Sequence, residues 1–163
     1  MSHPAAVIIC SDRAAAEVYE DRSGPVAVEA LIEAGFEVAS RVIVPDDPEQ
    51  IRLAIWTAVT EGARVVVTSG GTGVSPTDVT ADVTRELIAY EVPGLMEEVR
   101  RRGAEKVPTA LLSRGIAGIL AFDDARRAVI VNAPGSTGGV RDTMEVVAPL
   151  LTHLVDQLDG ADH

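Results

Sequence analysis

The sequence predicts one α/β domain, residues 1–163, built in three layers: a mostly parallel sheet with helices on both faces and an antiparallel hairpin at one edge. A length of 163 residues suits a single domain and is enough to bury a core. Apolar runs of strand length alternate with segments of helical periodicity, which is the pattern of a parallel α/β sheet. The runs Val7–Ile9, Val65–Val67 and Val129–Val131 are continuous and β-branched, as expected for strands covered on both faces.

Strands and helices alternate in the first half of the chain. In order, the predicted elements are strand Ala5–Cys10, helix Pro25–Ala34, strand Val38–Val44, a helix that opens at Asp47–Pro48, and strand Val65–Thr68. A glycine follows each helix, Gly35 and Gly62, where helices commonly end, and proline suits the first turn of the second helix.

The next stretch predicts three further helical segments. A helix is predicted over Thr80–Tyr90, with Thr80 as its N-terminal cap. A shorter helix over Leu95–Arg102 is expected to end at Gly103, and Thr109–Arg114 is expected to form one or two helical turns.

The C-terminal part predicts the hairpin, a long helix and a tail. The apolar runs Ile116–Phe122 and Arg127–Val131 are joined by a polar turn, which predicts two antiparallel strands. The final helix is predicted from Ser136 to Leu158, and the acidic tail Asp159–His163 is expected to fray.

Composition and charge exclude several classes of protein. The net charge is −11 at pH 7 and aromatic residues make up 3%, so no nucleic-acid partner is expected. Cys10 is the single cysteine, so neither an intramolecular disulfide nor a cysteine-rich metal site is expected. No apolar run reaches the roughly 18–20 residues that span a bilayer, and no leader pattern is seen. We therefore expect a cytoplasmic protein without a membrane partner.

The most informative segment is Thr68–Gly73, because it directly follows a predicted strand and holds three glycines in four positions. Open α/β sheets bind ligands at that end of their strands, and glycines let the backbone present amides to anionic oxygens. The segment matches neither the P-loop nor the dinucleotide-binding fingerprint. From these residues alone it is either a phosphate-binding loop or a tight surface turn.

Two aspartates also follow predicted strands. Asp46 comes after the strand that ends at Val44, and Asp78 comes shortly after the glycine-rich segment. Each carboxylate either acts on a bound ligand or metal ion, or favours the N-terminus of the helix that begins beside it, at Pro48 or Thr80.

Small and polar residues follow the first and the last parallel strand, at Ser11–Arg13 and Asn132–Ser136. Because parallel strands end at the same edge of a sheet, we expect these segments to converge with the glycine-rich segment. Ser136, which precedes the long helix, either leaves free amides for an anion or simply caps the helix.

The remaining polar residues show no catalytic pattern. The three histidines have no serine, cysteine or aspartate partner arrangement, so a Ser-His-Asp mechanism is not expected. The basic run Arg100–Arg102 is interpreted as a solvated helix face. Tyr19–Gly24 is either an ordered polar loop or a solvated connection.

Taken together and in this order, these segments resemble the MogA/MoaB family of molybdenum-cofactor biosynthesis, which includes the molybdopterin-binding G domains of gephyrin and its plant counterpart. The resemblance covers almost the whole chain. The segments that carry it are Ser11–Asp12, Glu20–Gly24, Val44–Asp46, Thr68–Gly73, Asp78–Thr80, Pro93–Gly94, Leu112–Arg114 and Asn132–Ser136.

The resemblance implies the molybdopterin-binding fold and a nucleotidyltransferase activity, molybdopterin adenylyltransferase. Such an enzyme converts ATP and molybdopterin into adenylylated molybdopterin and pyrophosphate with Mg²⁺. The resemblance matches Asp46 and Asp78 with two catalytic aspartates and makes Asp78 a candidate Mg²⁺ ligand. The residues it assigns to substrate binding are Ser11, Asp12, Ser69, Gly70, Gly71, Thr72, Gly73, Ser113, Arg114, Pro134, Gly135 and Ser136.

The resemblance also implies a homotrimer, which the residues do not distinguish from a hexamer, and a separate protein that inserts molybdate. Thr77 stands where many relatives carry arginine, and Arg13, Arg114 or Arg141 could supply that charge. The alternative function is a non-catalytic molybdopterin-binding or scaffolding protein of the same family. A third hypothesis is a regulatory nucleotide-binding domain.

Overall fold

The structure is a computed structural model that describes residues 1–162. The strands are β1 (Pro4–Cys10), β2 (Glu37–Val44), β3 (Val65–Ser69), β4 (Tyr90–Glu91), β5 (Ala117–Ala121) and β6 (Arg127–Ala133). The helices are α1 (Asp12–Ala15), α2 (Ser23–Glu33), α3 (Pro48–Thr60), α4 (Thr80–Leu87), α5 (Pro93–Lys106), the 3₁₀ helix η1 (Pro108–Leu112) and α6 (Thr137–Leu158). Among the described residues, no helix is both long and apolar enough to cross a membrane.

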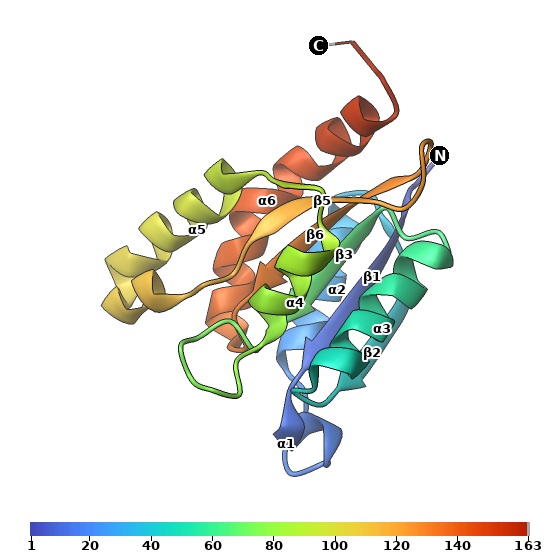
Figure 1. Cartoon of the computed structure of the whole chain (residues 1–163). Coiled ribbons are helices and arrows are strands. Elements are labelled where there is room, and N and C mark those ends of the chain that lie inside the picture. The colour runs from blue at the N-terminus through green and yellow to red at the C-terminus, as the bar shows by residue number, and fades with distance from the viewer. Residues whose placement is uncertain (163) are drawn as a thin grey trace.

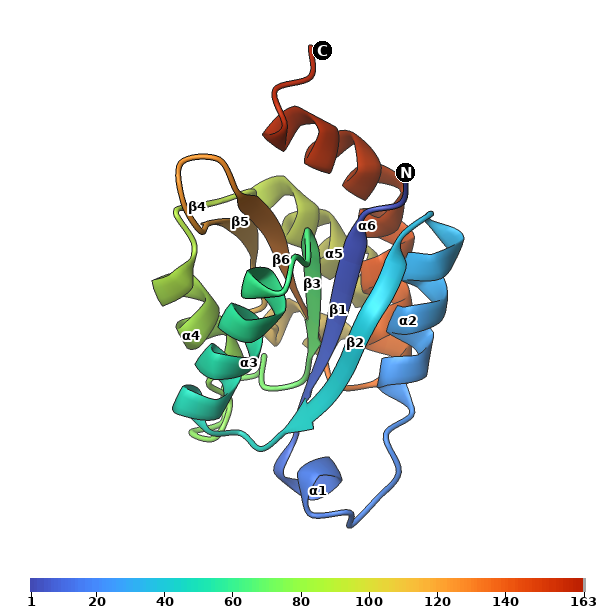
Figure 2. The ribbon, with the colours of Figure 1, turned by 90° about the vertical axis from the view of Figure 1, so that its right-hand side faces the viewer.

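The six strands form one mixed sheet in the order β2-β1-β3-β6-β5-β4. The pairs from β2 to β6 are parallel, whereas β5 pairs antiparallel with both β6 and β4. Helices α3 and α4 cover one face of the sheet, and α2, α5 and α6 cover the other (Figures 1 and 2). This arrangement confirms the predicted three-layer α/β fold.

Successive residues of the central strands face opposite helical layers. In β1, Val7 and Ile9 belong to the buried cluster beneath α2, α5 and α6. Ile8 and Cys10 belong to the cluster beneath α3 and α4. Both sides of each central strand are therefore apolar, which explains the continuous β-branched runs in the sequence.

The helix predicted over Thr80–Tyr90 is shorter than expected. It ends at Leu87, and Tyr90 begins β4, which pairs antiparallel with β5 and adds an edge strand beyond the predicted hairpin, which is present as β5 and β6. Thr80 does not cap this helix, because Val79 holds the cap position. The amide of Thr80 instead donates to the carbonyl of Gly71 at 3.1 Å, and its side chain is buried.

The helix predicted to end at Gly103 continues to Lys106. Gly103 is buried, and a Cβ atom at that position would lie 3.0 Å from the Cβ of Ala110 in η1. The glycine therefore permits the close approach of η1 and does not mark the helix end. The turns predicted over Thr109–Arg114 are this 3₁₀ helix, Pro108–Leu112.

The first residue of the predicted frayed tail is held in place. The Asp159 carboxylate accepts hydrogen bonds from both terminal nitrogens of Arg64, at 3.1 and 2.6 Å. This pairing holds the pKa of the Asp159 carboxyl below its usual value. The C-terminal end of α6 is thus tied to the start of β3, while His163 lies outside the described residues.

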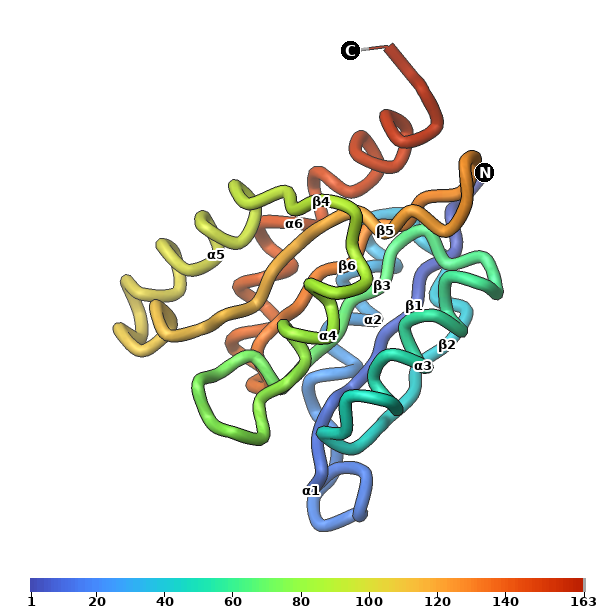
Figure 3. Tube along the Cα trace, viewed as in Figure 1, coloured from blue at the N-terminus to red at the C-terminus, as the bar shows by residue number. Residues whose placement is uncertain are grey.

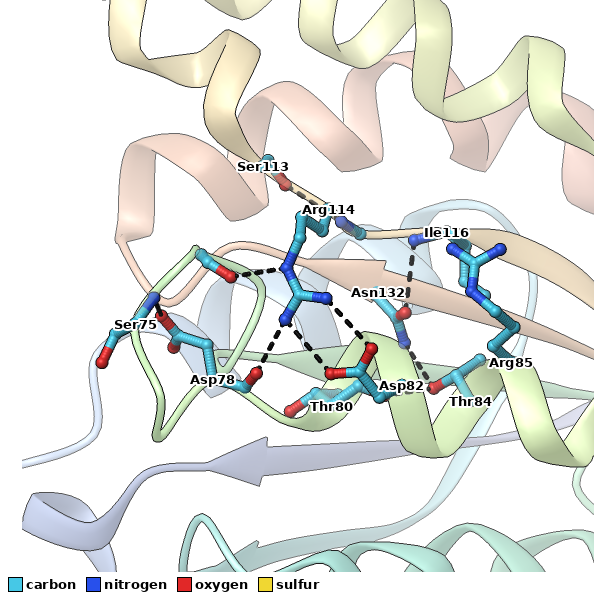
Figure 4. A network of polar contacts seen from close by, with 12 residues as sticks. Ser75, Asp78, Thr80, Asp82, Thr84, Arg85, Ser113, Arg114, Ile116 and Asn132 are labelled. Carbon is cyan, nitrogen blue, oxygen red and sulfur yellow. Dashed lines mark hydrogen bonds and ion pairs between the residues drawn. The ribbon is translucent and has the colours of Figure 1, made fainter.

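A buried amide joins the elements around the end of the sheet. The side chain of Asn132 in β6 is fully buried and donates to the hydroxyl oxygens of Thr68, at 2.9 Å, and Thr84, at 3.0 Å. Its oxygen accepts from the amide of Ile116 at 3.2 Å. Asn132 therefore links β3, β6, α4 and the segment that enters β5, as Figure 4 shows in part.

Replacing Asn132 with alanine should lower the free energy of unfolding by about 2–4 kcal/mol, because the Thr68 hydroxyl and the Ile116 amide lose their partner and the Thr84 hydroxyl loses one of two. Urea unfolding followed by circular dichroism measures this change. The control variant Thr84→Val removes one partner of the same amide and should cost about 1 kcal/mol. A loss below about 1 kcal/mol for Asn132→Ala would contradict the role of this network.

Candidate functional site

The carboxyl ends of β2, β1, β3 and β6 lie next to one another at a single edge of the sheet. The register pairs Cys10 with Val44, and it aligns Ser69 with Ile9 on one side and Ala133 on the other. In Figure 3, α1 and the loop between β3 and α4 both lie at this lower end of the molecule. The segments predicted to converge are therefore brought together here.

At the ends of β1 and β2, two aspartates bind each other's backbone. The amide of Asp12 donates to the Asp46 carboxylate at 3.1 Å, and the amide of Asp46 donates to the Asp12 carboxylate at 2.9 Å. Asp46 is not the cap of α3, because Asp47 accepts the capping hydrogen bond from Gln50 at 2.9 Å. Of the two interpretations of Asp46, helix capping is wrong.

The second carboxylate oxygen of Asp46 is buried and has no hydrogen-bond partner. Burial raises the pKa of this carboxyl, and the charges of Asp12 and Asp78 raise it further, against the lowering effect of the Asp12 amide. Asp78 therefore lies near enough to Asp46 for its charge to affect this carboxyl. A buried oxygen without a partner is rare in folded proteins and indicates a place for a bound donor or cation.

Ser11 lies at the end of β1 beside these carboxylates. Its hydroxyl caps α1 by accepting from the amide of Ala14 at 3.2 Å, and it lies 3.0 Å from the Tyr19 hydroxyl. Arg13 lies over the Tyr19 ring, 5.2 Å from its centroid. Ser11 and Asp12 are thus at the candidate site, as expected, and Tyr19 joins them from the following loop.

The glycine-rich segment requires glycine at two positions. Gly70 and Gly71 have φ angles of 101° and 67°, a region that other residues rarely adopt. A Cβ at Gly70 would lie 2.2 Å from the carbonyl oxygen of Cys10, and one at Gly71 would lie 2.2 Å from the Thr80 hydroxyl. The segment is therefore packed against β1 and α4 and is not a free surface turn.

Backbone amides are left free on both sides of this packed segment. Within the described residues, the amides of Gly71, Thr72 and Gly73 donate no hydrogen bond, and neither do those of residues 135–138. The two groups lie close together, since a Cβ at Gly135 would be 3.4 Å from the Cα of Gly70. Free amides of this kind, including those at a helix N-terminus, bind anionic oxygens.

Ser69 faces the protein interior. Its buried hydroxyl lies 3.0 Å from the carbonyl oxygen of Pro134 and 3.1 Å from the hydroxyl of Ser23. The Asp21 carboxylate accepts in turn from the amides of Ser23, at 3.1 Å, and Gly24, at 3.0 Å. Ser69 therefore joins β3 to β6 and α2. Tyr19–Arg22 is an ordered polar loop that leads directly into α2, which begins at Ser23, two residues before the predicted Pro25.

Asp78 closes a turn at the end of the glycine-rich loop. Its carboxylate accepts from the amide of Ser75 at 3.1 Å, and its own amide donates to the Ser75 carbonyl at 3.0 Å. These contacts occupy one carboxylate oxygen and leave the other without a hydrogen-bond partner among the described residues. Asp78 is half-buried and can still present an oxygen to a ligand.

The guanidinium of Arg114 is engaged by the protein itself (Figure 4). It donates to the carbonyl oxygens of Gly73, at 2.9 Å, and Asp78, at 2.8 Å, and forms an ion pair with Asp82. The neighbouring Ser113 accepts from the amide of Gly115 at 3.3 Å. Both predicted residues thus lie at the site, but the arginine is not free.

A cavity of about 510 Å³ opens beside the glycine-rich loop. It lies between that loop, η1 and the start of α6, and its lining includes Thr72, Ser113, Pro134 and Ser136. Ser136 caps α6 by accepting from the amide of Gly139 at 3.0 Å. This volume is in the range that binds small ligands.

A second cavity, of about 630 Å³, lies between α2 and α6 and contains none of the predicted site residues. The edge formed by the parallel strands therefore remains the better candidate for the functional site. Cys10 takes no part as a nucleophile, because burial raises the pKa of its thiol to about 12.

Two contributions escaped the sequence analysis or were misread. Asp82, the partner of Arg114, lies 32 residues away in the sequence and carries no local signal. Arg100, interpreted as solvated, is partly buried and donates to the carbonyl of Gly115 at 2.9 Å, whereas Arg101 and Arg102 are exposed as expected. Only contacts between distant segments reveal the roles of Asp82 and Arg100.

Of the arginines that could replace a charge at Thr77, only one has no hydrogen bond or ring contact. Arg13 stacks on Tyr19 and Arg114 is fully engaged. Arg141 lines the cavity and makes no hydrogen bond or ion pair with the described residues. Arg141 is therefore a free guanidinium in the lining of the cavity beside the glycine-rich loop.

The comparisons with known proteins agree with this geometry. The profile of the family described as "Probable molybdopterin binding domain" matches residues 6–153. The molybdopterin adenylyltransferase of Pyrococcus furiosus is 35% identical over 150 residues, which are 91% of this chain and 87% of that protein. The molybdenum cofactor biosynthesis bifunctional protein of Chlorobaculum tepidum is 36% identical over 99% of this chain, which spans only 50% of that relative.

Solved structures share the whole fold. The tungsten cofactor synthesizing protein MoaB from Pyrococcus furiosus matches with a TM-score of 0.91 and 32% identity, covering 97% of this chain and 98% of that one. The molybdopterin biosynthesis Mog protein from Mycobacterium ulcerans matches with a TM-score of 0.88 and 41% identity, covering 96% and 99%. The chain therefore belongs to the probable molybdopterin binding domain family, and the resemblance to MogA and MoaB is confirmed.

Proposed function

We propose that this chain is a molybdopterin adenylyltransferase that transfers the adenylyl group of ATP to molybdopterin and releases pyrophosphate. The observation that carries the proposal is the meeting of free backbone amides with Asp46 and Asp78 at one edge of the sheet. The name of the Pyrococcus furiosus relative, which the chain matches over most of its length, supports the same activity.

The reaction needs no nucleophile from the protein. The terminal phosphate of molybdopterin attacks the α-phosphorus of ATP, the new phosphoanhydride bond forms, and pyrophosphate leaves with the electron pair of the broken bond. What the protein must supply is alignment of the two anions and stabilisation of their charge. Amides of the glycine-rich loop and of the start of α6 suit this task, because they bind oxyanions without adding a mobile charge.

The donor set at this edge fits a magnesium ion. No group of three or more metal-binding side chains occurs among the described residues, but Mg²⁺ is commonly held by one or two carboxylates together with substrate phosphates. The unpartnered oxygen of Asp46 and the free oxygen of Asp78 are suitable ligands. When bound there, the ion would neutralise charge on the phosphates and on the leaving pyrophosphate.

The other substrate-binding residues are assigned by where they lie relative to the carboxylates and the cavity. We assign Ser11, Asp12, Ser113 and residues 134–136 to the walls that contact the two substrates, since they border the carboxylates or the cavity. Ser69 supports the wall from within. A homotrimer, a separate molybdate-insertion protein and a cytoplasmic location remain predictions from the family resemblance.

Replacing Asp78 with asparagine should lower molybdopterin-dependent pyrophosphate release by at least about 100-fold, because the charge is lost while the oxygen that accepts from Ser75 is kept. Purified protein with Mg-ATP, with and without molybdopterin, provides the assay. The matched control is Asp47→Asn, which removes an equal charge nearby and keeps a good helix cap.

The control should retain activity within about twofold, since the cap is not at the reacting groups. Normal turnover by Asp78→Asn would remove this residue from the mechanism. Tight molybdopterin binding by wild-type protein without pyrophosphate release would favour the non-catalytic binding function. In that case Thr77→Arg, which restores the side chain common among relatives, is the first variant to assay.

Asp46→Asn should abolish most activity yet increase thermal stability at pH 7 by about 1–3 °C. The raised pKa means that the ionised carboxylate costs folding free energy, and this cost is present above the folded-state pKa. This cost disappears below the pKa of an aspartate carboxyl in the unfolded chain, about 3.9, because the carboxyl is then protonated in both the folded and the unfolded state. The melting temperatures of the two proteins should therefore converge as the pH falls toward 4.

Differential scanning fluorimetry between pH 4 and pH 8 measures the effect. The asparagine can still accept from the Asp12 amide, so the loop is kept. An asparagine variant that melts below wild type at every pH would show that the carboxylate stabilises the fold instead.

A further inference from the structure

The loop that carries Asp78 has little structure of its own. Residues 70–79 connect β3 to α4, and residues 74–77 are exposed. Within the loop, two hydrogen bonds join Ser75 and Asp78 and close a small turn, without tying that turn to the rest of the protein. The position of Asp78 must therefore be set by contacts from outside the loop.

The two ends of the loop are joined to the core, since Gly70 donates to the Ala133 carbonyl and Gly71 accepts from the Thr80 amide, but the segment between them, residues 72–78, depends on one outside residue. In the described chain, every hydrogen bond that reaches residues 72–78 from outside the loop is donated by Arg114. Its backbone amide donates to the Thr72 carbonyl at 2.7 Å, its Nε to the Gly73 carbonyl at 2.9 Å, and its Nη2 to the Asp78 carbonyl at 2.8 Å. Arg114 thus contacts both ends of the loop (Figure 4).

Asp82 holds the guanidinium in this position. Its two carboxylate oxygens accept from Nη1 at 3.0 Å and from Nη2 at 3.2 Å, so the two side chains form a bidentate ion pair of fixed geometry. Asp82 lies in the first turn of α4, and the next turn is joined to the core by Thr84 and Asn132. The loop is therefore connected through Arg114 to the buried part of the domain.

The same contacts occupy most of the N–H donors of the Arg114 guanidinium. Four of its five N–H groups donate to the protein, and the Asp82 carboxylate neutralises its charge. A substrate phosphate would have to displace these partners before it could bind two N–H groups at once. An arginine that grips a phosphate needs donors that are free to receive it.

Resting on the proposed adenylyl transfer, we propose that Arg114 is a positioning residue and not a substrate ligand. Together with Asp82 it fixes residues 72–78 so that Asp78 and the free amides of the loop keep their place. This assignment replaces the sequence-based expectation that Arg114 binds substrate.

The test uses two variants. Arg114→Lys keeps the positive charge but loses the planar guanidinium with its several N–H donors. Asp82→Asn breaks the ion pair with Arg114 at a residue that does not contact the substrates. Glu86→Gln is the matched control, because Glu86 is an exposed acid of the same helix that pairs with Arg52. Hydrogen exchange of the amides of Ser75 and Asp78 is measured in substrate-free protein. Steady-state kinetics then give kcat, the KM for ATP and the Mg²⁺ concentration for half-maximal activity.

Both variants should increase the exchange of these amides about tenfold, while the melting temperature changes little. They should lower kcat about 10- to 100-fold, leave the KM for ATP within about threefold, and raise the Mg²⁺ requirement, because a misplaced Asp78 affects the reacting groups more than substrate binding. The kcat of the double variant should be no lower than that of the less active single variant, because both substitutions disrupt the same Arg114–Asp82 pair. Glu86→Gln should match wild type in every measurement.

Other results would overturn the proposal. A tenfold rise in the KM for ATP or molybdopterin with unchanged kcat in Arg114→Lys would make Arg114 a substrate ligand. Unchanged loop exchange in Asp82→Asn would show that the pair does not hold the loop. If wild-type protein releases no pyrophosphate, the proposed function is wrong. The role of Arg114 and Asp82 in holding the loop is still tested, because hydrogen exchange is compared without any substrate.

Discussion

The parallel pairing of β2, β1, β3 and β6 is the constraint on which the candidate site depends. Each parallel neighbour must be reached by a crossover, so every segment that leaves one of these strands starts at the same edge of the sheet. This is why Asp12, Asp46, the glycine-rich loop and Ser136 meet, although they are spread over most of the chain. The buried amide of Asn132 strengthens this edge, because it joins β6 to β3 and to α4 just beneath the loop.

The charges at this edge fit an acidic protein that handles anions. The chain carries a net charge of −11, and Asp12, Asp46 and Asp78 gather where the phosphates are proposed to bind. The nearby positive charge of Arg114 is cancelled by Asp82. In the proposed function, recognition would therefore depend on backbone amides, which carry no net charge, and on a cation shared between carboxylates and phosphates. The raised pKa of Asp46 follows from its burial and from the neighbouring charges of Asp12 and Asp78, and a cation bound there, as proposed, would offset it.

Several short-range patterns predicted the correct element but the wrong role for a residue. Asp46 and Asp47 are both suitable helix caps by residue type, yet only Asp47 caps α3, because Asp46 turns back to the amide of Asp12. Gly103 is of the residue type that commonly ends a helix, but it lies inside α5, where the absence of a side chain makes room for η1. In each case a tertiary contact competes with a local preference and prevails, since burial and packing outweigh the few tenths of a kcal/mol that separate local alternatives.

The sequence by itself determined the alternation of strands and helices, the mixed sheet, the position of the glycine-rich loop and the family, because these depend on periodicity and on residue types within short windows. The tertiary structure alone decided which polar groups meet. Arg114 and Asp82 are 32 residues apart, Asn132 and Thr68 are 64 apart, and Arg64 and Asp159 are 95 apart. No local pattern encodes such pairs, since they form only when distant segments are packed against the same sheet. The difference between an arginine that binds substrate and one that holds a loop is of this second kind.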